Sequence, residues 1–87
     1  MDKTRVAVIS IIVEDTSSTE ELNQLLSSCR DNIIGRMGIP YHQRGVNIIC
    51  VAIDASEDTI NALTGKIGKL KGISAKTNYS KVVSEEK

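Results

Sequence analysis

The sequence predicts an α+β domain of the ferredoxin-like order βαββαβ, with a four-stranded antiparallel sheet of order 4-1-3-2 and two helices on one face. Strand-like and helix-like patterns alternate along the chain in that order. The segments 5–13 and 46–54 are apolar on both alternating sets, which is typical of central strands. The segments 32–41 and 73–79 are half polar or interrupted, which is typical of edge strands. Right-handed crossovers place both helices on the same side of such a sheet.

A chain of 87 residues makes one domain, residues 1–87, with an expected ordered core at about 5–80 and a charged tail at 81–87. Eleven acidic residues balance eleven Lys and Arg, and this neutral total disfavours a protein that mainly holds a nucleic-acid backbone. The N-terminus lacks a signal-peptide pattern, and no apolar run approaches the ~20 residues that span a bilayer. A cytoplasmic protein without a membrane partner is therefore expected.

The first strand, residues 5–13, is followed by a polar break at 14–18 and by a helix predicted at about 19–30. Two overlapping capping boxes mark the start of this helix, namely Ser17 with Glu20 and Ser18 with Glu21. Leu22, Leu25, Leu26 and Cys29 follow the spacing i, i+3, i+4, i+7 of a buried helical face.

The segment 32–41 is predicted to be a bulged edge strand, because Gly35 and Gly38 interrupt it and Pro40 cannot donate to a strand ladder. Its alternating apolar set comprises Ile33, Met37, Ile39 and Tyr41. Residues 42–45 form a turn in which Gly45 supplies any positive φ, and the central strand 46–54 follows.

The second helix is predicted over residues 58–71, with its buried stripe at Ile60, Leu63, Ile67 and Leu70. Gly72 is placed to end this helix in a left-handed conformation. Gly65 and Gly68 lie inside the helix, where each costs about 1 kcal/mol relative to alanine. Close packing against that face, within the domain or from another subunit, would account for this cost.

The two central strands are also apolar on the side opposite the helices, and no segment of sequence remains to cover that side. A monomer would expose an apolar patch above the few hundred Å² that soluble monomers usually tolerate. We therefore expect a homodimer or a higher homo-oligomer, associating through sheet faces or sheet edges.

No arrangement of residues predicts catalysis or a cofactor. Thr64-Gly65-Lys66 departs from the phosphate-loop signature, because Ile60 stands where that motif has glycine and Ile67 where it has Ser or Thr. His42 is the single histidine and lies on a turn, so the chain is not expected to be an enzyme.

Two alternatives to a binding module stay open. The first is a small metal-binding protein that uses His42 with Cys29 or Cys50, although both thiols occupy core-like positions without ligand spacing. The second is direct DNA binding by a lysine-rich helix end, in which four lysines fall near one another: Lys66, Lys69, Lys71 and Lys76.

Three stretches resemble the small bacterial iron-only hydrogenase system regulators: residues 58–77, Gly35-Arg-Met-Gly-Ile-Pro40 and residues 9–15. This resemblance implies an ACT-like fold, similar to the C-terminal domain of the nickel-responsive repressor, and a role in transcriptional regulation linked to hydrogenase maturation. The first loop lacks the glycine typical of amino-acid-binding ACT domains, and the repressor's several histidines are missing. Ligand identity and metal binding therefore do not transfer. DNA binding is not expected to transfer either, because the sequence shows no counterpart of the repressor's DNA-reading domain.

The sequence thus favours an oligomeric regulatory module without catalytic activity or a cofactor. Its expected partners are further copies of itself and a small-molecule effector or a hydrogenase-maturation protein, and direct contact with nucleic acid is not expected. The candidate binding residues are Arg36, Gly38, Pro40, His42, Gly65, Lys66 and Gly68.

Overall fold

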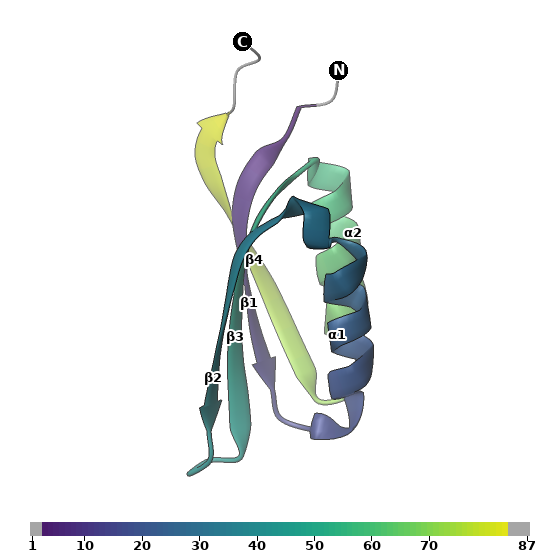
Figure 1. Ribbon diagram of the computed structural model, residues 1–87, viewed down its shortest axis with the longest axis vertical. Coiled ribbons are helices and arrows are strands. Elements are labelled where there is room, and N and C mark those ends of the chain that lie inside the picture. The colour runs from purple at the N-terminus through teal and green to yellow at the C-terminus, as the bar shows by residue number, and fades with distance from the viewer. Residues whose placement is uncertain (1–2, 84–87) are drawn as a thin grey trace.

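The computed structural model describes residues 3–83 and shows one sheet with two helices packed on the same side (Figure 1). The strands are β1 (Arg5–Val13), β2 (Ile33–Tyr41), β3 (Val46–Ala55) and β4 (Ile73–Val83), and the helices are α1 (Thr19–Ser28) and α2 (Glu57–Gly68). Two short 3-10 turns, η1 (Thr16–Ser18) and η2 (Arg30–Asn32), flank α1. The strand order β2-β3-β1-β4 is fully antiparallel. It confirms the predicted ferredoxin-like order.

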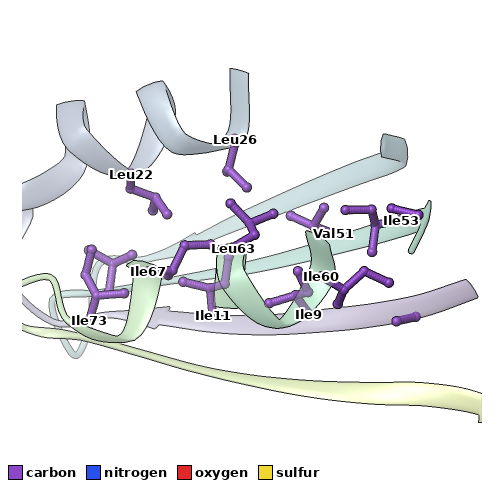
Figure 2. Close-up of a cluster of buried hydrophobic side chains, with 13 residues drawn as sticks. Ile9, Ile11, Leu22, Leu26, Val51, Ile53, Ile60, Leu63, Ile67 and Ile73 are labelled. Carbon is purple, nitrogen blue, oxygen red and sulfur yellow. The ribbon is translucent and has the colours of Figure 1, made fainter. Parts of the chain in front are cut away.

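The core fills the space between the helices and one face of the sheet, as Figure 2 shows. One alternating set of β1 faces the helices and is almost completely buried, with Ile9 and Ile11 at 0% exposure. From the helices, Leu22 and Leu26 of α1 and Leu63 of α2 close this layer. The buried hydrophobic cluster is entirely aliphatic: Ala7, Ile9, Ile11, Val13, Leu22, Leu26, Val51, Ile53, Ala55, Ile60, Leu63, Ile67 and Ile73.

Helix α1 begins at Thr19 as predicted, but its capping differs from the prediction. The side chain of Ser18, the N-cap residue, makes no capping hydrogen bond. Instead, Asp15 accepts a hydrogen bond from the backbone N–H of Ser17 at 2.9 Å and begins the η1 turn that leads into the helix. Both predicted capping boxes are wrong, because this extra 3-10 turn takes the place of a direct entry into the α-helix. At its other end α1 stops at Ser28, two residues before the predicted limit.

The second helix begins at a cap and ends earlier than expected. Ser56 accepts a hydrogen bond from the backbone N–H of Thr59 at 3.2 Å, as an N-cap does. The helix ends at Gly68, and Gly72 adopts the predicted left-handed conformation (φ +72°) in the following turn. The Gly72 carbonyl accepts from the N–H of Glu14 at 2.7 Å, so this turn packs directly on the end of β1.

The bulge predicted in β2 is confirmed and lies between Ile33 and Gly35. It divides the apolar set that the sequence placed together. Ile33 pairs with the buried Ile53 and faces the helices, whereas the set from Met37 onward faces the other side of the sheet. An extra residue in one strand reverses the direction of every side chain beyond it.

The last strand is longer than predicted, since β4 runs to Val83 rather than ending near residue 79. Residues 81–83 of the expected tail therefore belong to the sheet. The rest of that tail, residues 84–87, lies outside the described residues.

Candidate functional site

The side of the sheet away from the helices, here called the open face, is covered by no element of residues 3–83 (Figure 1). On each strand, every second side chain points to this face, and these side chains lie beside one another on neighbouring strands. Large apolar side chains dominate this face and are between 36% and 56% exposed: Val6, Val8, Ile12, Met37, Ile39, Tyr41 and Ile48. The apolar second side that the sequence predicts for the central strands is therefore present and uncovered in the single chain.

A groove between the two helices, here called the interhelix groove, consists of two hollows of about 500 and 210 Å³. The two hollows share Leu25, Ser28 and Lys66, so they lie next to each other. The larger hollow adds Glu21, Gln24, Lys69 and Leu70, and the smaller adds Cys29, Thr59, Ala62 and Leu63. An apolar floor with a few charged groups at the rim, at this size, is characteristic of small-molecule sites.

A smaller cavity of about 240 Å³, here called the hairpin pocket, lies on the β2–β3 hairpin. It is lined by Arg36, Gly38, Ile39, Pro40, Asn47 and Ile49. The Arg36 guanidinium donates to the side-chain oxygen of Asn23 at 2.9 Å, which links β2 to α1. The volume lies below the range of about 300–1,000 Å³ usual for drug-sized ligands, so the pocket suits a small group or a partner side chain.

The residues predicted to bind are distributed over separate surfaces. Arg36, Gly38 and Pro40 come together in the hairpin pocket, while Lys66 lines the interhelix groove. His42 is exposed in the turn between β2 and β3. A single chain therefore does not bring the predicted residues of segment 36–42 and those of segment 65–68 into one site.

The two glycines of α2 are not packed against anything within the described chain. A Cβ atom built on Gly65 or on Gly68 meets no heavy atom within 4 Å, apart from the immediate chain neighbours and the backbone of the helix itself. Both residues are exposed, because the apolar stripe of α2 turns the opposite side toward the sheet. Close packing of these glycines inside the helix layer was therefore a wrong prediction, and packing by another subunit stays a prediction.

Two polar features escaped the sequence reasoning. A shallow hollow of about 700 Å³ along α1 is lined only by polar residues, from Thr16 to Ser27. Separately, Arg5 stacks over the Tyr79 ring, with its guanidinium carbon 4.5 Å from the ring centroid. The Tyr79 hydroxyl donates to the side-chain oxygen of Asn61 at 2.6 Å. Arg5, Asn61 and Tyr79 are far apart in the sequence, so no local sequence pattern predicts that they form a cluster.

This cluster holds the start of α2 to the two strands beneath it. Arg5 also lies 3.7 Å from the Glu57 carboxylate and donates to the Ser80 carbonyl. Desolvation, followed by the nearby Glu57 carboxylate, raises the pKa of Tyr79 above its ordinary value. A tyrosine with a raised pKa stays protonated at neutral pH, so its role here is to donate a hydrogen bond that stabilises the fold.

The lysines expected to form one basic patch are divided between the two layers. Lys66 and Lys69 line the interhelix groove, and Lys71 lies 3.9 Å from Asp15. Lys76 pairs in register with Ser10, on the open face. The proximity predicted for all four lysines is therefore wrong, because the sheet separates Lys76 from the others.

The two cysteines lie on opposite sides of the sheet. Cys29 packs against the core from the end of α1, whereas Cys50 pairs with Ser10 on the open face. Both thiols are free and half-buried, so the core position expected for Cys50 is wrong. Within residues 3–83, no three His, Cys, Asp or Glu side chains gather in a group that could hold a metal ion.

Comparison with known proteins decides the family. Residues 5–77 match the TM1266-like family model, described as "Iron-only hydrogenase system regulator, putative". The chain belongs to this family. The match spans β1, β2, β3, both helices and the first five residues of β4. It includes each of the three stretches that carried the resemblance.

Solved structures agree with the fold of this family member. The structure of TM1266 from Thermotoga maritima is similar to it with a TM-score of 0.86 and 30% identity, over 90% of this chain and 99% of that one. A formyltetrahydrofolate deformylase from Pseudomonas putida KT2440 shares 13% identity with a TM-score of 0.62, over 84% of this chain and 28% of that one. At that identity the likeness shows the fold alone.

A comparison with curated proteins found no match. Among the residues that the structure describes, neither helix has the length and apolar character needed to cross a membrane.

Proposed function

We propose that this family member is a non-catalytic regulatory protein of the iron-only hydrogenase system that acts as a homo-oligomer and binds an effector or a hydrogenase-maturation protein. The family match over residues 5–77 carries the proposal. The exposed position of the single histidine supports it, since His42 on a turn has no carboxylate or nucleophile partner among the described contacts. A ligand that binds the native oligomer more tightly than other states shifts its population, and regulation needs no chemistry beyond that shift.

The interhelix groove is the proposed effector site. Its larger hollow of about 500 Å³ lies within the usual range for small ligands, and Leu25 and Leu70 supply apolar surface. Lys66 and Lys69 outnumber the single carboxylate of Glu21 at the rim. This charge balance favours a small organic anion with an apolar portion over a cation.

The hairpin pocket is the proposed second contact surface, where a neighbouring subunit or a maturation protein would engage Arg36, Gly38 and Pro40. The exposed Gly65 and Gly68 allow a close backbone approach on α2. We keep the expectation that these glycines meet residues 36–42 of a neighbouring subunit.

Thermal denaturation with a ligand panel tests the effector site. The panel contains amino acids, nucleotides, small apolar carboxylates and metal ions. A ligand present at 100 times its Kd stabilises the native state by about 2.7 kcal/mol, which raises Tm by several degrees in a domain of this size. We expect a carboxylate or another anion to give this shift, and we expect the Lys66→Ala variant to lose it.

Lys3→Ala is the matched control, because it removes the same charge from an exposed position before β1, outside both the groove and the paired rows of the open face. An anion that stabilises the wild type and Lys66→Ala equally would contradict the groove as the site. A panel without any hit would exclude the tested effectors and leave binding of a maturation protein, which a pull-down with the purified maturation proteins measures directly.

The alternative of direct DNA binding has less support, because the four lysines lie on two sides of the sheet. A gel-shift assay with the promoter of its own operon at low and high salt tests it, since backbone contacts weaken steeply as salt rises.

A further inference from the structure

The open face contrasts with the polar surface expected of a free monomer. Along β1, Val8 is 41% exposed and Ile12 is 43% exposed, and their partners on β3, Ala52 and Ile48, are also apolar. Their partners on β4, Asn78 and Ser74, are polar, so the apolar part of the open face lies over β1, β3 and β2. Ile12 pairs with Ile48, and Ile48 pairs with Ile39, so three strands contribute one continuous apolar row. Contiguous apolar surface of this kind marks an interaction site.

Both sheet edges carry features that oppose the addition of another strand. The β2 edge contains Pro40, two glycines and the bulge after Ile33. The β4 edge contains Lys76 and Lys81 and is irregular where it pairs with the start of β1. Proline, lysine and bulges are the devices by which natural proteins block edge-to-edge pairing. The sequence predicted association through sheet faces or through sheet edges. Because both edges carry these features, the open face is the remaining route.

The dimensions of the face suit a stable contact between two copies. Four strands spaced about 4.8 Å apart and nine residues that each rise about 3.3 Å give a face of roughly 19 by 30 Å. Two such faces in contact remove on the order of 1,100 Å² from water, which exceeds the roughly 800 Å² of typical crystal contacts and clears the ~1,000 Å² expected of a biological interface.

The charges on the face also permit self-association. Its paired rows include two charged side chains among the described residues, Lys76 on the outer strand β4 and Asp54 near the end of β3. Ser10 and Cys50, neither of which is an acidic or basic residue, occupy the middle of the face. The formal net charge of the chain is zero, so two copies do not repel each other at long range.

We infer that the open face of one copy packs against the open face of a second copy, which makes a symmetric two-sheet sandwich with the four helices outside. Sheets stacked face to face lie about 10 Å apart, and their inner side chains interdigitate. The same surface serves both partners, as a two-fold interface requires. This inference rests on the proposed function in one respect, the oligomeric state, and is independent of the effector site.

Sedimentation velocity of the full chain between 1 and 200 µM tests the interface. The wild type sediments as a dimer or as a larger assembly of dimers. Val8→Glu and Ile48→Glu each place a charge inside the contact and raise the dissociation constant by about 100-fold or more, because a desolvated unpaired charge costs several kcal/mol. Ser27→Glu, which adds the same charge on the exposed surface of α1, leaves the assembly unchanged.

Thiol reactivity tests the same face without a disruptive substitution. In the variant Cys29→Ala, Cys50 is the only thiol, and it lies at the middle of the open face. Its reaction with a thiol reagent slows by about tenfold or more between dilute and concentrated protein, as the dimer forms and covers it.

Two results overturn the inference in different ways. A monomer throughout the concentration range rejects the interface and the oligomeric part of the proposed function together. An oligomer in which Cys50 reacts equally at all concentrations and Val8→Glu has no effect rejects the face but keeps the oligomer. Neither result bears on the thermal shift by an anion, which tests the effector site separately.

Discussion

The two faces of the sheet come from the same strands yet meet different environments. On the face toward the helices, Ile9 and Ile11 are fully buried, whereas Val8 and Ile12, their neighbours along β1, are more than 40% exposed. Both sets are mainly apolar, with Ser10 the polar exception on the open face, so the sequence of β1 gives little indication of which set is covered. The difference lies in what covers each face, since both crossover helices pack on one side. An apolar set of alternating strand residues therefore identifies a side of the sheet that favours burial. It does not say whether that side is covered by the same chain or by another molecule.

The largest effect expected from this comparison is on the stability of the single chain. Ile9→Ala leaves a cavity in the closed layer and lowers the free energy of unfolding by about 2–5 kcal/mol. Ile12→Ala on the open face costs about 1 kcal/mol or less in the dilute monomer, where its main loss is β-propensity. Urea unfolding followed by circular dichroism measures both. Equal losses for the two variants at low concentration would contradict the assignment of the faces.

A second pair of variants extends the comparison to two glycines, one packed and one open. Gly72 has a positive φ, and a Cβ atom added there collides with the Cβ of Asp15. We expect Gly72→Ala to destabilise by about 1–3 kcal/mol, because both the backbone conformation and the contact oppose a side chain. Gly65 lies in a helix with open space around it, so Gly65→Ala stabilises the monomer by about 1 kcal/mol.

Thermal denaturation of both glycine variants at low and high concentration distinguishes the environments. A gain from Gly65→Ala that turns into a loss as the protein is concentrated would show that another copy approaches α2 closely. A loss at every concentration would contradict the open environment of Gly65.

The smallest effect concerns the pH dependence set by Asp15. Hydrogen bonds from the backbone and then the hydroxyl of Ser17 lower the pKa of Asp15 below its ordinary value, and Lys71 adds a minor attraction. A carboxylate with a depressed pKa contributes stability above its unfolded pKa of about 3.9 and loses that contribution as pH falls through the folded value. We expect Asp15→Asn to lose less stability than the wild type between pH 5 and pH 3. Parallel urea titrations at these two pH values measure the difference, and identical losses would exclude the contribution.

Much of the fold followed from local patterns in the sequence. The limits of β1 were predicted without error, and so were the bulge in β2 and the positive φ of Gly45 and Gly72. These features depend on a few adjacent residues whose conformational preferences agree with the global arrangement. The start of α1 at Thr19 was also predicted, but its capping was missed, because Asp15 caps the preceding turn in place of Ser17 or Ser18 and the sequence offers all three as capping residues.

The candidate site was predicted less well, for a physical reason. Arg36 and Pro40 are close in sequence and did meet in one pocket, whereas the interhelix groove joins residues of two helices and only Lys66 was foreseen there. Four lysines that are near in sequence fell on different sides, because the strand beyond Gly72 carries Lys76 to the open face. Grooves and patches depend on the direction of side chains in space, which sequence spacing does not specify across a turn.

The sequence by itself determined the order of the elements, the order of the strands and the existence of two apolar faces, because strand and helix periodicities and the handedness of crossovers are local properties. Only the tertiary structure decided which face the chain covers for itself, on which side each lysine and cysteine lies, and where hollows form between elements. Those outcomes depend on the packing of segments far apart in sequence, and the balance of their contacts is set only when the whole domain folds.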